Sequence, residues 1–166
     1  PLYSFSENTA DLIAERGFLY DSSLMADDVP YVLASRSGDV IEVPIHDMSD
    51  DWPQYVDNWD FDFHASIKPP ELGIEVFKAE FDAAWEHRGM WISVWHPFVS
   101  GRLSRAMQVV KLIEYMQDKG GVWFATLHEI AAHIQACARD GSYQPRRVNM
   151  PYHTAPVAEL ADVKPK

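Results

Sequence analysis

The residue with the clearest chemical potential ends an apolar run, Met90-Trp-Ile-Ser-Val-Trp-His96-Pro97. The run is rich in β-branched and aromatic residues and stops at a proline, which predicts a buried strand that opens into a loop. In open α/β sheets and in barrels, ligands bind beyond the carboxyl ends of strands, and catalytic groups come from those ends. His96 is therefore a candidate functional residue. The alternative is a histidine that caps a strand and bonds to the backbone.

A second candidate segment, Val43-Pro-Ile-His-Asp-Met-Ser-Asp50-Asp51-Trp52-Pro53, follows another expected strand. It places carboxylates beside an aromatic side chain, so it could supply an acid that orients a histidine from a neighbouring strand end. The alternative is that this segment only caps a short helix, because aspartate is a common N-cap residue. The residues by themselves leave both interpretations open.

Other arrangements are weaker candidates. His128 and His133 resemble a zinc-protease motif but are five residues apart, so on a helix their rings point about 140° apart and a shared metal is not expected. The carboxylates of residues 57–62 lack the glycine and terminal glutamate of an EF-hand loop. Cys137 lies among helix formers and is expected to be a small buried hydrophobe. The sequence contains no glycine-rich phosphate-binding loop and no nucleophile elbow.

Composition restricts the classes of partner. The 166 residues suffice for one domain with a core, and 47% of them are hydrophobic. The net charge of -11 and the pI near 4.9 argue against nucleic acid or an anionic membrane as partner, because like charges repel at long range. One cysteine excludes an internal disulfide. We expect a soluble cytoplasmic protein; residues that precede Pro1 lie outside this expectation.

Helices and strands alternate along the chain. Spacing and stop signals predict helices over residues 6–16, 71–87, 102–119 and 126–139, and short strands over 18–21, 31–34, 40–45, 90–96 and 122–125. Thr126 and Glu129 match a capping box. The turn residues 36–39 favour a hairpin or two sequential strands. Residues 46–70 are expected to form a long loop with one helical turn. The order from Met90 to Arg139 predicts an α/β fold with right-handed crossovers and a parallel sheet or barrel.

Five short segments, in order, resemble the polysaccharide deacetylase family with the NodB homology domain, also called carbohydrate esterase family 4. They are Ser4-Phe-Ser-Glu-Asn-Thr-Ala-Asp-Leu12, Gly17-Phe-Leu-Tyr-Asp-Ser-Ser23, Asp50-Asp-Trp-Pro53, Trp95-His-Pro97 and Gly120-Gly-Val-Trp-Phe-Ala-Thr126. Within the family, the chain is most similar to the branch of peptidoglycan-deacetylase-like proteins, cyclic imide hydrolases and metal-independent allantoinases. The likeness runs from Pro1 to about Pro156.

The resemblance implies a distorted (β/α) barrel that hydrolyses C–N amide bonds with a bound divalent metal, zinc being the expected ion. His96 matches the histidine taken to protonate the leaving nitrogen, and Asp51 matches the aspartate that orients it. Trp52 corresponds to the aromatic wall beside the substrate, with Pro97 as a second substrate contact. The physical logic agrees, because expelling an amine requires a positioned acid, and a carboxylate partner favours a charged histidine. Asp51 is preferred to Asp50 because it directly precedes Trp52.

The family's early Asp-Asp motif and its His-x-x-x-His motif, which supply the base and the metal ligands, do not occur in this sequence. Pro1 would be the proline of the family's Arg-x-Pro motif. We therefore expect residues 1–140 to be the C-terminal part of a deacetylase-like barrel, and residues 141–166 to be an extended tail over the surface or an adjacent subunit. We also expect that the metal is bound by residues outside this chain, in an N-terminal portion of the protein.

Two classes of function stay open. The first is an amide hydrolase, acting either on an N-acetylated sugar or on a small cyclic imide or ureide, with residues 52–63 covering a closed pocket in the second case. This chain by itself is then expected to be inactive, because an acid without base or metal leaves most of the barrier in place. The second class is a noncatalytic binding or assembly module. In either case we expect a homo-oligomer.

Overall fold

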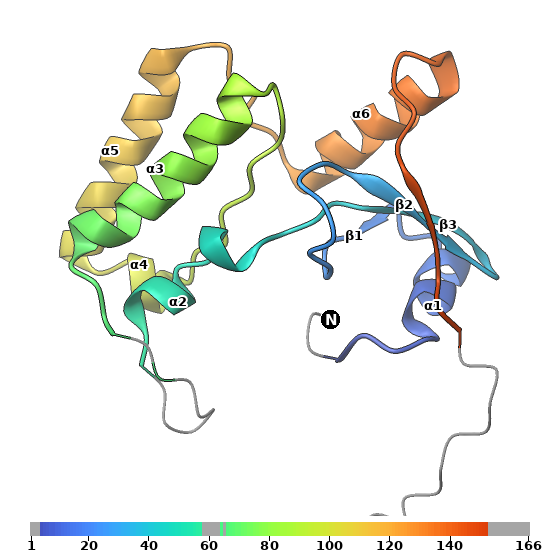
Figure 1. Ribbon diagram of the computed structural model, residues 1–166, viewed down its shortest axis with the longest axis horizontal. Helices are drawn as coiled ribbons and strands as arrows, with labels where there is room; N and C mark the ends of the chain where they lie inside the picture. The colour runs from blue at the N-terminus through green and yellow to red at the C-terminus, as the bar shows by residue number, and fades with distance from the viewer. Residues whose placement is uncertain (1–3, 58–63, 65, 153–166) are drawn as a thin grey trace, which may run out of the picture.

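The structure is a computed structural model that describes residues 4–57, 64 and 66–152 (Figure 1). A four-stranded sheet lies beside a pair of long helices. In chain order the elements are α1 (Thr9–Glu15), β1 (Tyr20–Asp21), β2 (Tyr31–Ser35), β3 (Gly38–Glu42), the 3-10 turn η2 (Asp47–Ser49), α2 (Trp52–Tyr55), α3 (Pro70–Glu86), α4 (Pro97–Ser100), α5 (Leu103–Lys119), α6 (Leu127–Asp140) and β4 (Arg147–Asn149).

The sheet is mixed, with strand order β1-β3-β2-β4. β2 and β3 form an antiparallel hairpin, which decides between the two arrangements that the turn residues allowed, while β1 pairs parallel with β3 and β4 parallel with β2. Alternation along the strands gives the sheet two apolar faces. Val32, Ile41 and Val43 pack against Ala131 of α6 on one face, and a second cluster on the other face includes Ile13 and Ala14 of α1. β4 lies in the segment expected to be a tail.

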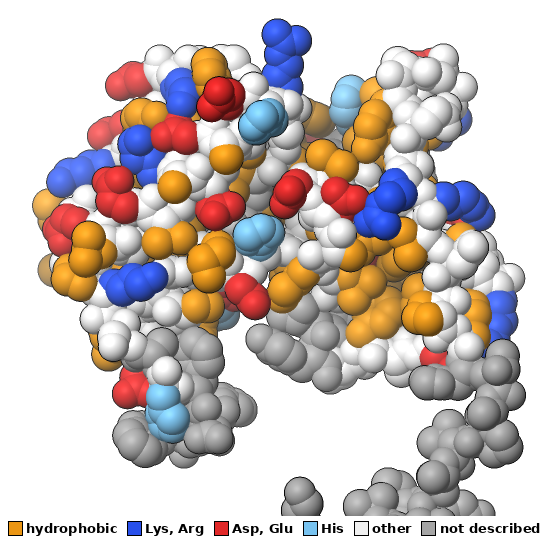
Figure 2. All heavy atoms as spheres, viewed as in Figure 1, with side chains coloured by type: hydrophobic (Ala, Val, Ile, Leu, Met, Phe, Trp, Pro, Cys, Tyr) orange, Lys and Arg blue, Asp and Glu red, His pale blue; other side chains and the backbone are white. Residues whose placement is uncertain are grey.

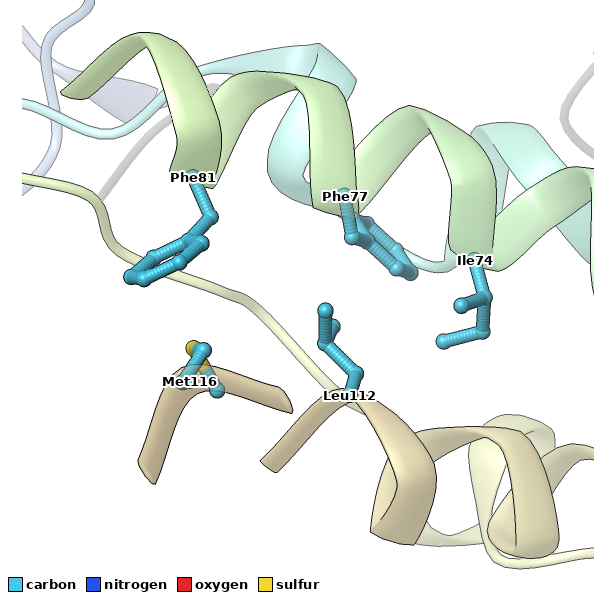
Figure 3. Close-up of a cluster of buried hydrophobic side chains, with 5 residues drawn as sticks. All are labelled: Ile74, Phe77, Phe81, Leu112 and Met116. Carbon is cyan, nitrogen blue, oxygen red and sulfur yellow. The ribbon is translucent and has the colours of Figure 1, made fainter. Parts of the chain in front are cut away.

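The long helices form where the apolar spacing predicted them. α3 and α5 lie side by side and enclose a core of their own (Figure 3), built from Ile74, Phe77, Phe81, Leu112 and Met116. Both Gly120 and Gly121 have positive φ, a conformation that favours glycine and ends α5. The capping box at Thr126 and Glu129 is present at the start of α6. Charged side chains of both signs are interspersed with hydrophobic ones on the visible surface of α3 and α5 (Figure 2).

Two predicted strands are wrong. Residues 90–96 are extended but only half-buried, and they form a single bridge, between Val94 and Asp50. Residues 122–125 belong to no strand of the described residues, and Trp123 and Phe124 are 59% and 54% exposed. Both segments have the composition of strands, but a strand also needs a neighbour for its backbone hydrogen bonds. Neither segment is therefore one of the four strands of the described sheet.

Tyr55 fixes the short helix α2 on α3. Its hydroxyl donates to Pro70 O at 2.9 Å, and the Arg105 guanidinium lies 4.7 Å from the ring centre. No helix in the described part of the chain combines the length and apolar character of a membrane span.

The Tyr55 ring lies so close to α3 that a Cβ added at Gly73 would be 2.2 Å from the Tyr55 hydroxyl oxygen. This contact predicts that Gly73→Ala destabilises the fold. Because the buried Tyr55 ring has to move, we expect a loss of about 1–3 kcal/mol in the free energy of unfolding, measured by urea denaturation. Gly89→Ala is the matched control, since a Cβ there would lie 3.6 Å from the nearest heavy atom, Ala84 O. Equal stability of the two variants would contradict the close contact.

Candidate functional site

The bridge between Asp50 and Val94 brings the two candidate segments together. Val94 N donates to Ser49 O at 2.8 Å, and Asp51 N donates to Val94 O at 3.1 Å. A side-chain bond from Trp91 Nε1 to Ser49 Oγ, at 2.9 Å, supports the same alignment. Asp51 and His96, which are 45 residues apart in sequence, therefore lie beside each other just beyond the bridge.

Asp51 carries a buried carboxylate that accepts three hydrogen bonds. The residue is fully buried, its Oδ1 lies 2.6 Å from His96 Nδ1, and its Oδ2 accepts the backbone N–H of His96 at 3.0 Å. Ser100 Oγ donates to the same Oδ2 at 2.5 Å. Such a carboxylate is held rigidly, because each oxygen has a donor and water has no access to it.

His96 is the N-cap residue of α4, and one third of its side chain is exposed. Because Nδ1 faces Asp51, Nε2 is the ring nitrogen left to face a ligand. Trp52 and Phe98 contact the imidazole edge-on, with ring centres 5.4 and 5.6 Å away, and they contact each other at 5.8 Å. Phe98 is 60% exposed, so aromatic surface adjoins the histidine at the surface of the molecule. Pro97, the other predicted substrate contact, is exposed beside them.

Asp50 is positioned differently from Asp51. Its Oδ1 lies 3.7 Å from His96 Nδ1 and accepts the backbone N–H of Trp52 at 2.7 Å. Burial raises the pKa of Asp50, with the Trp52 N–H and the His96 charge opposing that rise. The geometry therefore pairs Asp51, not Asp50, with the histidine ring, and Asp50 supports the start of α2.

Sequence reasoning missed two residues of this site, Ser100 and Phe98. Ser100 lies one helical turn after His96, and its backbone N–H donates to His96 O at 2.9 Å. A hydroxyl one turn after the histidine was the available signal, but nothing in the sequence showed that it would meet Asp51. Phe98 follows directly on the Trp95-His-Pro97 motif, and its position next to that motif was the only indication of its role.

Asp50, Asp51 and His96 also form the one group of metal-binding residue types close enough to share an ion among the described residues, with one ligand atom from each within 4.8 Å of the others. These residues do not fit a metal well. Both oxygens of Asp51 already accept hydrogen bonds, and His96 Nδ1 is engaged with Oδ1. An ion here would have to displace the imidazole from the carboxylate, so the arrangement is that of an acid–base pair.

The remaining candidates do not join this site. His128 and His133 are both exposed on α6 and belong to no metal-binding group in the part of the chain that the structure describes. Cys137 is half-buried, not fully buried as expected, and its Sγ lies 3.5 Å from His133 Nε2. Asp57 is described, whereas the rest of its acidic stretch, residues 58–62, lies outside the described residues.

Comparisons with known proteins show which proteins this chain resembles. The chain is 37% identical to a Mycobacterium smegmatis protein assigned to the polysaccharide deacetylases, with a TM-score of 0.79 over 92% of this chain and 52% of that one. A Pseudomonas aeruginosa protein with the same assignment is 27% identical, with a TM-score of 0.66 over 82% of this chain and 45% of that one. The chain resembles the C-terminal part of polysaccharide deacetylases. The resemblance and the fold class inferred from the sequence are thereby confirmed.

Two further comparisons extend the likeness. The peptidoglycan deacetylase of Helicobacter pylori is 27% identical over 161 aligned residues, which cover 79% of this chain and 54% of that protein. The Puue allantoinase, at 23% identity and a TM-score of 0.67 over 84% of this chain and 45% of that one, shares the fold. No family model matches the chain. The chain spans about half the length of these deacetylase-type relatives.

The bond from Ser100 to Asp51 predicts that Ser100→Ala destabilises the protein. The variant removes a donor from a buried carboxylate, so we expect the free energy of unfolding to fall by about 1–3 kcal/mol, measured by urea denaturation near neutral pH. Ser104→Ala changes an exposed serine and should stay within about 0.5 kcal/mol of the parent. A Ser100 variant as stable as the Ser104 variant would mean that this hydrogen bond does not support the site.

Proposed function

We propose that the chain supplies the proton-donating side of an active site that hydrolyses C–N amide bonds. The observation that carries this proposal is the contact of 2.6 Å between His96 Nδ1 and the buried Asp51 Oδ1. An imidazole that is held at one nitrogen by a carboxylate and free at the other is suited to general acid–base catalysis. The similarity of the chain to deacetylases supports the same class of reaction.

The proposed chemistry assigns His96 the protonation of the leaving nitrogen. In the charged imidazole, the Nδ1 proton stays in its bond to Asp51, and Nε2 carries the proton that is transferred. When the C–N bond of the tetrahedral intermediate breaks, the nitrogen takes this proton and leaves as a neutral amine, and His96 becomes neutral. Asp51 accepts the Nδ1–H, so the neutral ring that remains after the transfer keeps its proton on Nδ1.

The proposed substrate is an N-acetylated sugar. Trp52, Phe98 and Pro97 offer apolar surface next to His96, and rings of this kind suit the flat faces of sugars. Similar proteins include a peptidoglycan deacetylase and a protein assigned to the polysaccharide deacetylases. A small cyclic imide or ureide is the second candidate, because an allantoinase shares the fold.

We also propose that a divalent metal, with zinc the expected ion, and the base are held by residues outside this chain, in an N-terminal portion of the protein. The reason is local: among the residues that the structure describes, the one group that could hold a metal is committed to the bond between Asp51 and His96. This chain alone is then expected to lack activity. Homo-oligomer formation and a cytoplasmic location stay predictions.

The proposed role of His96 as the acid is tested by removing its side chain. His96→Ala in the intact protein should lower turnover by roughly a hundredfold or more, since the leaving amine loses its proton donor. Turnover is measured on N-acetylglucosamine oligosaccharides and on small cyclic imides. His87→Ala, at an exposed histidine after α3, is the control and should leave turnover unchanged. An active His96→Ala variant with intact fold would exclude the role of acid for His96.

Substitutions at the two aspartates test which of them orients His96. Asp51→Asn should lower turnover on the order of a hundredfold to ten-thousandfold, because an amide no longer favours the neutral tautomer that keeps its proton on Nδ1. Asp50→Asn, one residue away, should have a much smaller effect, since Oδ1 of Asp50 bonds to the Trp52 N–H instead. Both variants are assayed on the same substrates, and their folding is checked by circular dichroism. The reverse order of effects would assign the orienting role to Asp50.

A further inference from the structure

Three polar side chains form a row across one face of the sheet, away from the His96 site. Asp21 of β1 is in register with Glu42 of β3, and Glu42 is in register with Tyr31 of β2. Side chains at paired positions of neighbouring strands point to the same face of a sheet. The two carboxyl groups are therefore lateral neighbours, and the Tyr31 phenol is next to Glu42.

The row is buried and only partly satisfied. Glu42 is fully buried, Tyr31 is 1% exposed, and Asp21 is 9% exposed. Glu42 Oε1 accepts the backbone N–H groups of Ser23 and Leu24, at 3.0 and 2.8 Å, and Asp21 Oδ1 accepts Ser23 Oγ at 3.0 Å. The second oxygen of each carboxyl group, Glu42 Oε2 and Asp21 Oδ2, is buried without a donor, and the buried Tyr31 hydroxyl has no hydrogen-bond partner.

The charged groups around the row do not neutralise it. Arg146 lies over the Tyr31 ring, at 5.0 Å, but its guanidinium is paired with Asp27. Arg147 of β4 is in register with Val32, so it lies on the opposite face of the sheet, where it is paired with Asp39. From α1, Asp11 accepts hydrogen bonds from Ser37 N and Tyr152 Oη at the other end of the hairpin. Two ionised carboxylates side by side in this environment would be strongly unfavourable.

We propose that Glu42 and Asp21 share one proton, between Oε2 and Oδ2. This proton stabilises the packing of β1 and the following loop on the sheet, and its loss in alkali weakens that packing. The proton supplies the donor that the two unpartnered oxygens lack. Its loss would leave two adjacent buried negative charges on β1 and β3. β1 is a two-residue strand at the edge of the sheet, so it is the element expected to separate first.

The electrostatics of the row support this inference. Burial raises the pKa of Glu42 to about 8, and the Asp21 carboxyl, which lies within hydrogen-bonding reach, raises it as well, against the lowering effect of the Ser23 and Leu24 N–H groups. Burial and the Glu42 charge raise the pKa of Tyr31 to about 12, so the phenol stays neutral over the same range of pH. Tyr31 therefore adds no charge that would compete for the proton.

The sign of the pH effect follows from proton binding. Above the ordinary pKa of a glutamate and below about 8, the folded protein keeps a proton on Glu42 that the unfolded chain has lost. Stability then falls as pH rises through this window, with the folding equilibrium constant decreasing by up to about tenfold per pH unit, and levels off above it.

The direct test is a carbon-13 NMR titration of the glutamate side-chain carboxyl groups in the intact protein. We expect one glutamate to titrate more than about two pH units above an ordinary glutamate, and Glu42→Gln to remove that resonance alone. Glu75→Gln, at an exposed glutamate on α3, should remove an ordinary one. If every glutamate titrates in the ordinary range, the shared proton does not exist.

The effect of this proton on β1 and the following loop is tested by hydrogen exchange of the Ser23 and Leu24 amides between pH 6 and 9. The rates are corrected for the intrinsic pH dependence of exchange. In the parent protein their protection should fall at least tenfold across this range, whereas in Glu42→Gln and in Asp21→Asn it should stay nearly constant, because neither pair can become doubly charged. Either variant suffices if the other does not fold. The proposal would be overturned if amide protection in the parent did not change with pH. It would also be overturned if a folded variant lost as much protection as the parent.

Discussion

The candidate site depends on the buried charge of Asp51. A carboxylate without access to water is stable only if donors replace its hydration. Here all three donors, His96 N, His96 Nδ1 and Ser100 Oγ, come from a single stretch of five residues. Satisfying the charge therefore fixes the direction of the imidazole and the start of α4 at the same time. The position of the proton donor is a consequence of the electrostatic requirement of its partner.

The rest of the fold brings that donor set to the carboxylate. The bridge between Asp50 and Val94 aligns two segments that are far apart in sequence. The Val94 segment is held in turn by its tryptophans, because Trp91 and Trp95 pack on Phe77 of the core between α3 and α5, while Trp91 also bonds to Ser49. A packed interior is rigid on the scale of a hydrogen bond. The helix pair thus positions His96, although it contributes no group to the chemistry.

The sequence carried the identities of the central residues but not all of their environment. The pairing of His96 with Asp51 could be predicted because their neighbouring motifs resemble those of a known family. The helices α3, α5 and α6 could be predicted because apolar spacing and end signals are local properties. The prediction of strands at 90–96 and 122–125 was wrong because a strand needs a neighbouring strand to pair with, and composition does not reveal whether one is present. The contact of Ser100 with Asp51 spans 49 residues, and local pattern contains no information on such a contact.

Asp51 and the pair formed by Glu42 and Asp21 show why residue type alone does not predict charge. Asp51 meets three donors with one carboxylate, so ionisation is supported at both of its oxygens. Glu42 and Asp21 meet three donors with two carboxyl groups, and the two remaining oxygens lie in the row without a donor. The number of donors per carboxyl group, which only the folded structure sets, decides between a fixed anion and a retained proton. The same residue type thus orients an acid at one place and responds to alkali at another.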